Sequence, residues 1–302
     1  MTKKFYSNGK LLLTGEYGVL DGALALAVPT RYGQSLIRTQ NTTKKIVWKS
    51  FDHQSKIWFE ALFDSTTLKI ISSTDSQIAE TLQKIVLEAQ KLNTSFLSEN
   101  VGYEVNTFLD FPRDWGLGSS STLLNNVAQW AEVNPFTLLW NAFTGSGYDI
   151  ACAQHNKPIT YQVLEKKPLV TEVAFTPHFL DAIYFIHLNT KQNSREGINS
   201  YRKAAFDSQR FISKITSLTN EIRSCKNIDL FKQLILAHEA LVGAVLQKTP
   251  IQQERFSDFN GAIKSLGAWG GDFIMAVGDK NTPRYFQGKG YATVLPYAEM
   301  VL

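Results

Sequence analysis

Residues 114–130 read DWGLGSSSTLLNNVAQW, a glycine–serine junction that runs directly into a segment with helical spacing. Gly116 and Gly118 have no β-carbon, so the backbone can approach another group closely at these two positions. Residues 119–121 are serines at the expected start of a helix, where unpaired N–H groups and the positive end of the helix dipole lie. The junction therefore predicts a phosphate site, and the alternative is an ordinary serine-capped helix after a glycine turn.

The hydrophobic pattern of the 302-residue chain predicts mixed α and β structure. The first part is rich in strand-like runs, at 9–15, 23–38, 44–50, 56–63, 68–72 and 102–109, with one helix at 76–92. Helical spacing then predicts helices at 119–132 and 135–143, followed by a turn at 145–151. The remainder predicts strands at 158–165, 169–175, 182–188 and 272–278, and helices at 196–222, 229–247 and 251–265.

Composition narrows the class of protein. A hydrophobic content of 44% with 12% aromatic residues predicts a well-packed globular chain. No apolar run approaches the roughly 18 residues of a spanning helix, and the start MTKKFYSNGK lacks a signal-peptide pattern, so we expect a cytoplasmic protein without a membrane partner. Cys152 and Cys225 are too isolated to predict a disulfide framework or a thiolate metal site. The net charge of +4 is spread without basic runs, which favours a small anionic substrate over nucleic acid.

Four stretches, in this order, carry a family resemblance. They are GKLLLTGEYGVLDGALALAVP at 9–29, GLGSSS at 116–121, GSGYDIA at 145–151 and KSLGAWGGDFIMA at 264–276. Together they resemble the GHMP kinase superfamily, most of all its mevalonate kinase and phosphomevalonate kinase branch. The first is similar to the family's N-terminal motif, the second to its phosphate loop, the third to the segment of the catalytic aspartate, and the fourth to its C-terminal glycine motif.

The resemblance implies a fold and an activity. The fold is the two-domain α+β GHMP kinase fold, with a β-rich ATP-binding domain at 1–165, a ferredoxin-like α+β domain at 166–302, and the active site between them. The activity is that of an ATP- and Mg²⁺-dependent kinase, which transfers the γ-phosphoryl group to a hydroxyl or phosphate of an anionic metabolite, as in isoprenoid biosynthesis. The expected partners are ATP and that metabolite; the acceptor and the oligomeric state stay open, with a homodimer as one alternative.

Phosphoryl transfer requires positioning, neutralisation of phosphate charge, and a group that accepts the proton of the attacking hydroxyl. The resemblance makes Asp149 that base and places Lys10 beside it, where an ammonium keeps the aspartate ionised. It also makes Ser120 a ligand of Mg²⁺. For both charged residues the alternative is structural: a solvated lysine at a strand end, and a turn or N-cap aspartate. The expected cofactor-binding residues are Trp115, Gly116, Leu117, Gly118, Ser119, Ser120 and Ser121.

The substrate side is predicted from the first and last motifs and from residues 188–202. Its expected residues are Glu16, Lys191, Ser194, Arg195, Gly267, Gly270 and Gly271, with Arg202 and Asp272 as further candidates. The glycines are expected to let their loop close over phosphates or substrate, and the alternative is a helix C-cap. For Glu16 the alternative is a structural ion pair with Lys10 or Arg31, and for the basic residues it is a solvated helix start.

Three positions depart from the family pattern. Leu138 stands where mevalonate kinases have a metal-binding glutamate, Trp269 replaces a glycine of the fourth motif, and Trp115 precedes the phosphate loop. Either tryptophan reshapes the nucleotide pocket or is a core anchor. These departures keep open a catalytically silent homologue that senses a nucleotide or metabolite. A basic nucleic-acid module is the rival from another class.

Overall fold

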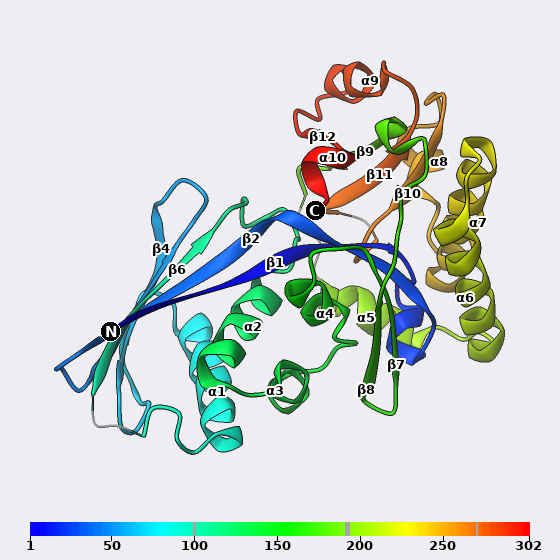
Figure 1. Cartoon of the computed structure of the whole chain (residues 1–302). Helices are drawn as coiled ribbons and strands as arrows, with labels where there is room; N and C mark the ends of the chain where they lie inside the picture. Colours follow the sequence, from blue (N-terminus) through cyan, green and yellow to red (C-terminus); the bar gives the residue numbers. More distant parts are fainter. Residues whose placement is uncertain (99–100, 191–193, 270) are drawn as a thin grey trace. The chain divides into compact units, whose positions relative to one another are not determined.

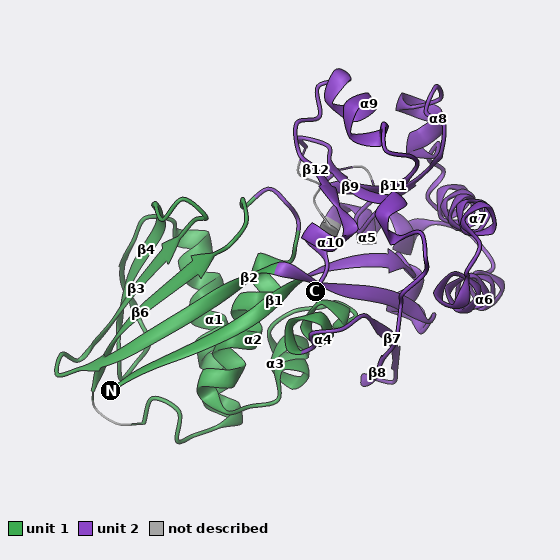
Figure 2. Ribbon diagram, turned by 45° about the horizontal axis from the view of Figure 1, so that its top comes forward, with its two compact units in different colours: residues 1–9, 32–113, 117–154 green, residues 10–31, 114–116, 155–302 purple. Residues whose placement is uncertain are grey.

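The computed structural model describes residues 1–98, 101–190, 194–269 and 271–302. The chain forms two compact units, coloured separately in Figure 2, and each is assembled from segments that are discontinuous in sequence. Unit 1 comprises residues 1–9, 32–113 and 117–154, and unit 2 comprises residues 10–31, 114–116 and 155–302. A domain boundary at 165/166 stays a prediction. Within the described ranges no helix is both long and apolar enough to cross a membrane.

Unit 1 is a sheet with helices (Figure 1). Its elements are β3 (Lys45–Phe51), β4 (Ile57–Asp64), β5 (Ile70–Ser73), β6 (Gly102–Leu109), α1 (Ser76–Leu92), α2 (Ser119–Ala131), α3 (Pro135–Ala142) and α4 (Tyr148–Gln154). The long strands β1 (Thr2–Thr14) and β2 (Ala25–Asn41) contribute residues to both units. The larger sheet has the order β5-β4-β3-β6-β2-β7-β8, in which β7 is Ile159–Leu164 and β8 is Lys167–Glu172, and β1 pairs with β2.

Unit 2 contains the smaller sheet, which has the order β10-β11-β9-β12 and is antiparallel throughout. The strands of this sheet are β9 (Ile183–His187), β10 (Ala262–Ser265), β11 (Phe273–Val277) and β12 (Val294–Pro296). Unit 2 also contains β7 and β8 of the larger sheet. Its helices are α5 (Ser194–Lys203), α6 (Ser208–Ser224), α7 (Ile228–Leu246), α8 (Ile251–Arg255), α9 (Thr282–Gly288) and α10 (Tyr297–Met300), with 3₁₀ turns η1 (Gly18–Asp21) and η2 (Leu180–Ala182). The expected α+β class is confirmed.

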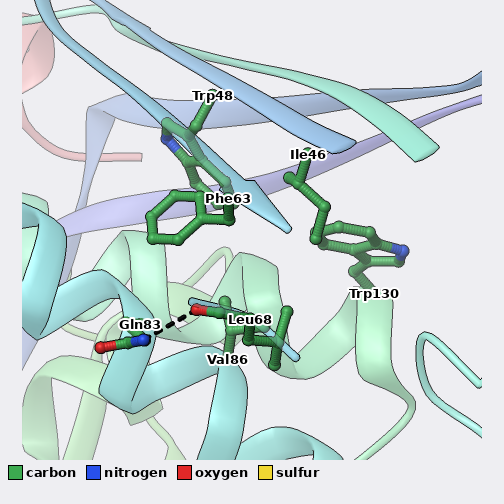
Figure 3. A pocket seen from close by; sticks show the side chains of 7 residues that line it. All are labelled: Ile46, Trp48, Phe63, Leu68, Gln83, Val86 and Trp130. Atoms are coloured by element: carbon green, nitrogen blue, oxygen red, sulfur yellow. Dashed lines mark hydrogen bonds between the residues drawn. The ribbon is translucent and has the colours of Figure 1, made fainter. Parts of the chain in front are cut away.

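Helix α1 shows how local sequence sets an element and its packing. The Asp75 side chain accepts a hydrogen bond from the Ile78 N–H and so caps the helix, and the buried residues then recur at helical spacing. This apolar face packs toward β3 and β4, where a small pocket remains (Figure 3). Its lining is apolar apart from Gln83, whose Nε2 donates to the Leu68 carbonyl at 2.7 Å. The pocket is part of the core of unit 1.

The position of α2 depends on a buried seam of polar side chains. Ser7 Oγ on β1 donates to Asn126 Oδ1 and accepts from Asn125 Nδ2, both at 2.8 Å. Asn126 Nδ2 also donates to the Gln34 carbonyl at 2.9 Å. Gln154, at the end of α4, donates to Asn125 Oδ1 at 3.0 Å. Since buried amides must be hydrogen-bonded, this seam fixes one orientation of α2 and ties α4 to it.

Several predicted elements were wrong. The helix predicted at 251–265 ends at Arg255, because the turn formers Asp258, Asn260 and Gly261 follow, and residues 262–265 form β10 instead. The helix predicted at 196–222 is two helices, since Asp207 caps the second by accepting from the Arg210 N–H. The turn predicted at 145–151 holds the first residues of α4. The elements α9, α10 and β12 were not predicted.

The polar seam generates a test. Ser7→Ala should lower the free energy of unfolding by about 1 to 3 kcal/mol, because two buried amides each lose a partner. Urea denaturation measures the change. The matched control is Ser98→Ala, which removes an exposed hydroxyl bonded to the Ser95 carbonyl and should change stability by less than about 0.5 kcal/mol. Equal effects of the two substitutions would contradict a structural role for the seam.

Candidate functional site

The glycine–serine junction forms the start of α2. Gly118 is the N-cap residue and has φ 87°, in the left-handed region that favours glycine. Its carbonyl accepts from the N–H groups of Ser121 and Thr122, both at 3.0 Å. In the part of the chain that the structure describes, no side chain caps this helix start, and Ser120 is exposed there. Uncapped N–H groups at a helix N-terminus suit an anion, as the sequence predicts.

Asp149 lies in the first turn of α4 and is partly buried. Because Gln154 of the same helix is bonded to Asn125 of α2, unit 1 holds the serine segment and the Asp149 helix on one hydrogen-bonded frame. The sequence carries a signal for this frame, because two consecutive asparagines lie between Leu124 and Val127 in the middle of the helix.

Gly116 is the point in unit 2 where residues of three motifs meet. Lys10 Nζ donates to the Gly116 carbonyl at 3.0 Å. A β-carbon on Gly116 would lie 2.3 Å from the carboxyl carbon of Asp272, and Gly116 itself has φ 65°. Two features therefore exclude a side chain at this position: the positive φ of Gly116 and the neighbouring Asp272 carboxylate. The first motif, the phosphate loop and the last motif thus converge at one glycine.

Hydrogen bonds of its backbone hold Asp272 in place. Its N–H donates to the Thr190 carbonyl at 2.7 Å, and its carbonyl accepts from the Leu188 N–H at 2.8 Å. Its φ of 53° lies in the left-handed region, which an aspartate tolerates better than most residues. These two bonds fix the carboxylate next to Gly116.

The two residues that flank Gly116 pack their side chains. The Trp115 ring meets Phe273 edge to face at 5.4 Å, and it lies 6.4 Å from His187. His187 Nε2 is 3.1 Å from the Asp114 carbonyl, which anchors the segment before the loop. The Leu117 side chain is fully buried in unit 1. A direct ligand contact by these two side chains stays a prediction.

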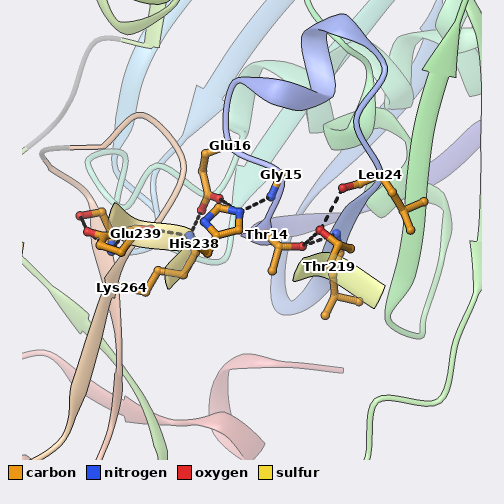
Figure 4. A network of polar contacts seen from close by, with 10 residues as sticks. Thr14, Gly15, Glu16, Leu24, Thr219, His238, Glu239 and Lys264 are labelled. Carbon is orange, nitrogen blue, oxygen red and sulfur yellow. Dashed lines mark hydrogen bonds and ion pairs between the residues drawn. The ribbon is translucent and has the colours of Figure 1, made fainter. Parts of the chain in front are cut away.

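Glu16 is the centre of a buried polar network in unit 2 (Figure 4). Its carboxylate forms an ion pair with Lys264, and both side chains have no exposed surface. Lys264 Nζ also donates to the Ser265 carbonyl at 2.9 Å. The expected partners, Lys10 and Arg31, were wrong: Lys10 bonds to Gly116, and Arg31 bonds to the Ala298 carbonyl at 2.7 Å. The true partner lies 248 residues away in sequence, where no local pattern points to it.

His238 and Glu239 of α7 complete the network. His238 Nε2 accepts from the Gly15 N–H at 3.0 Å and lies 3.6 Å from Glu16 Oε2, so the ring proton is assigned to Nδ1. Burial, followed by the charge of Lys264, lowers the pKa of His238 well below 6.5, and the ring is neutral. Glu239 accepts from the Ser265 N–H at 3.1 Å and from its hydroxyl at 2.6 Å.

Burial dominates the carboxyl groups of this network. It raises the pKa of Glu239 to about 7, although Lys264 and Ser265 act in the opposite direction. It also raises the pKa of Glu16, again against the lowering effect of Lys264. Two acids with raised pKa values therefore share a buried network with Lys264, the first residue of the last glycine motif.

The structure describes only some of the remaining residues that are predicted on the substrate side. Lys191 and Gly270 lie outside the described residues, and so do the side chains of Ser194 and Arg195. Gly267 has φ 61°, and a β-carbon there would meet nothing within 4 Å, whereas Gly271 is buried. Arg202 is engaged by Asp21 at 2.5 Å. Their substrate contacts stay predictions.

Two of the three positions that depart from the family pattern are core positions. Trp269 is 2% exposed and packs in a cluster with residues of α6 and α7. Leu138 is fully buried in α3. Trp269 is therefore the core anchor that the sequence left as one alternative. Among the described residues, no group of three or more His, Cys, Asp or Glu side chains is placed to hold a metal ion.

No protein-family model and no curated protein sequence matches this chain. Solved structures do. The mevalonate kinase of Methanococcus jannaschii matches with a TM-score of 0.70 at 13% identity, covering 96% of this chain and 94% of that chain. Phosphomevalonate kinase of Streptococcus pneumoniae, solved with phosphomevalonate and AMPPNP, matches with a TM-score of 0.70 at 15% identity and 95% coverage of both chains. Galactokinase of Lactococcus lactis with galactose matches with a TM-score of 0.69 at 15% identity, covering 97% and 92%.

These three proteins share one architecture. They are GHMP kinases, so the chain has the fold of that superfamily. The fold expected from the four motifs is thereby confirmed along nearly the whole chain.

The buried network generates a prediction on pH. The folded pKa of Glu239, about 7, lies above its ordinary value of 4.5, so the folded state holds the proton more tightly. The stabilisation is complete below about pH 4.5 and is lost as the pH rises to about 7. Relative to Glu239→Gln, wild type should therefore lose stability across this window, by up to about 1.4 kcal/mol per pH unit. Urea denaturation of both proteins from about pH 5 to about pH 8 measures the difference, in which the His238 contribution cancels.

The matched control is Glu254→Gln, because Glu254 is exposed on α8. Its difference from wild type should not change with pH in that window. A Glu239→Gln difference that is equally flat would show that the buried carboxyl does not titrate there.

Proposed function

We propose that this chain is an ATP- and Mg²⁺-dependent kinase that phosphorylates a small anionic metabolite. The observation that carries the proposal is the arrangement at Gly116, where Lys10 bonds the carbonyl and the Asp272 carboxylate fills the space of the missing side chain. A lysine supplies the positive charge that phosphates require, and Lys10 is bonded to the residue two positions before Gly118, the N-cap of α2. The GHMP kinase fold supports the same assignment.

The proposed nucleotide site is the start of α2. Its N–H groups, its positive dipole end and the hydroxyls of residues 119–121 would bind the phosphates, with Gly118 as the turn that exposes them. Mg²⁺ commonly takes only one or two protein ligands and completes its shell with phosphates and water. The exposed Ser120 hydroxyl fits such a ligand, and the buried Leu138 does not. The bound ion would neutralise charge on the transferred phosphoryl group.

We propose Asp149 as the base that accepts the proton of the attacking hydroxyl, and Lys10 as the cation that stabilises developing negative charge. Asp149 sits in the first turn of α4 and is partly buried. An ionised carboxylate is the form that can take a proton.

The proposed acceptor is anionic, with mevalonate or its phosphate as the leading candidates. The net charge of +4 and the basic residues of the 191–202 segment favour it, because a carboxylate or phosphate pairs with lysine or arginine. The phosphomevalonate kinase among the similar structures was solved with phosphomevalonate. A galactokinase with galactose is equally similar, so a sugar is the competing acceptor.

A silent homologue that only senses a nucleotide is the alternative function. Leu138, in place of the metal-binding glutamate, favours it. The presence of both Lys10 and Asp149 argues against it, and the burial of Trp269 in the α6–α7 cluster removes one reason to suspect a blocked pocket.

Nucleotide binding tests the first half of the proposal. Gly118→Val should abolish detectable MgATP binding in calorimetry, because valine adds bulk at the loop and disfavours φ 87°. The matched control is Gly290→Val: Gly290 has φ 90°, and a β-carbon there meets nothing within 4 Å. Both variants carry the same backbone strain, so circular dichroism should show both folded, and only the first should lose MgATP. Unchanged affinity in Gly118→Val would sink the phosphate-loop assignment.

Turnover tests the second half. Asp149→Asn should lower turnover about a hundredfold to ten-thousandfold while MgATP affinity stays within about threefold of wild type. The matched control is Asp229→Asn, which alters an aspartate in the first turn of another helix, α7, and should leave turnover unchanged. If Asp149→Asn kept more than about half of wild-type turnover, the base would have to be another group.

A further inference from the structure

Tyr17 has an unusual backbone for a bulky residue. Its φ is 62°, in the left-handed region, and its side chain is only 6% exposed. Such a conformation is unfavourable for a bulky residue and persists only where surrounding contacts enforce it. It follows Glu16 directly, so it belongs to the first motif, and all of its contacts described below lie in unit 2.

The hydroxyl of Tyr17 reaches the last glycine motif. Tyr17 Oη donates to the Ala268 carbonyl at 2.8 Å, and the ring stacks on Tyr201 of α5 at 5.4 Å. Burial raises the pKa of the Tyr17 phenol, and the Glu16 charge adds to this, so the hydroxyl keeps its proton and remains a donor. Gly197 of α5 makes room for it, because a β-carbon there would lie 2.4 Å from Tyr17 Oη.

The segment that Tyr17 holds is anchored at further points. The backbone N–H of Trp269 donates to the Leu266 carbonyl at 3.4 Å and so closes a turn. The Trp269 ring then seats on Gly243 of α7, where a β-carbon would lie 2.8 Å from a ring carbon. Asp272 is bonded through its backbone to Leu188 and Thr190. Three described residues of this motif, at 268, 269 and 272, are therefore anchored to other parts of unit 2.

We propose that Tyr17 is a positioning residue for the nucleotide: through the Ala268 carbonyl it holds residues 266–269 of the last glycine motif, and the Asp272 carboxylate of the same motif lies against Gly116. This role rests on the proposed function, since Gly116 and Lys10 belong to the proposed phosphate site. This role requires no contact of Tyr17 with Gly116 or Lys10. Tyr17 acts through the glycine segment.

Removing only the Tyr17 hydroxyl distinguishes the positioning role from simple packing of the ring. Tyr17→Phe keeps the ring, its stacking on Tyr201 and the backbone strain, and removes only the bond to Ala268. We expect the dissociation constant of MgATP, measured by calorimetry, to rise about three- to tenfold, as the loss of one positioning hydrogen bond permits. The matched control is Tyr201→Phe, which removes a hydroxyl bonded to Asp21 at 2.6 Å in the same stack and should leave the dissociation constant unchanged.

Gly197 supplies a second, independent arm. Gly197→Ala should weaken MgATP binding in the wild-type background, because the new methyl group displaces the Tyr17 hydroxyl. In the Tyr17→Phe background the same substitution should add little, since the nearest remaining ring carbon lies 3.3 Å from that methyl position. Non-additivity in this double-mutant cycle is the signature of an effect that passes through the hydroxyl.

The outcomes distinguish a failure of the Tyr17 proposal from a failure of the proposed kinase function. If wild type binds MgATP and Tyr17→Phe binds it with unchanged affinity, the positioning role is overturned and the proposed kinase stands. A Tyr17→Phe variant that loses only stability in urea, with the same affinity, has the same meaning. If wild type binds no MgATP at all, the proposed function fails and the role of Tyr17 in nucleotide positioning fails with it.

Discussion

The ion pair of Glu16 and Lys264 is the interaction on which the candidate site in unit 2 depends. It joins the end of β1 to β10, two strands that are 248 residues apart along the chain, and both side chains are fully buried. Removing one partner of such a pair leaves an uncompensated buried charge and typically costs about 3 to 5 kcal/mol. Sliding β10 against the first motif would carry the same penalty. The pair therefore sets the register of Gly15 to Tyr17 against the segment that follows Lys264.

The neighbours of the pair extend this register into the site. On one side, His238 accepts from the Gly15 N–H, and Glu239 accepts from the Ser265 N–H, so α7 is bonded to both partners' segments. On the other side, the residues after Ser265 lead to the turn that Tyr17 holds and to Asp272. Lys10 lies six residues before Glu16 on the same motif and bonds Gly116. A charge pair in the core thus has consequences for the geometry at the proposed phosphate site.

The sequence predicted well what local chemistry determines. Helix α1 was predicted at 76–92 and has those bounds, because a capping aspartate and a regular apolar face mark it. Strand β6 was predicted at 102–109 with equal success. The prediction for 251–265 failed because helix α8 and the buried strand β10 are both too short, at five and four residues, to show a period of their own. The motifs located the Gly116–Gly118 junction, and the GHMP fold followed from their order.

Long-range pairing could not be predicted. Nothing near Glu16 indicates Lys264, and nothing near Tyr17 indicates Ala268, because each partner becomes a neighbour only through the fold. Trp269 shows the same limit. In the sequence it stands in place of a family glycine, which suggests a reshaped nucleotide pocket. In the structure its ring packs over Gly243 in α7. The structural role of Trp269 therefore depends on Gly243, which lies 26 positions earlier in the chain.

Phosphoryl transfer itself tests the central claim most directly. The purified chain is incubated with ATP and Mg²⁺ together with mevalonate, phosphomevalonate or galactose, and phosphorus NMR follows the nucleotide and any new phosphate ester. The account predicts that ADP and a phosphorylated product form in step with an anionic acceptor, more slowly with galactose, and hardly at all without an acceptor. Tight binding of MgATP with no product from any acceptor would contradict it and would leave the nucleotide sensor as the better description.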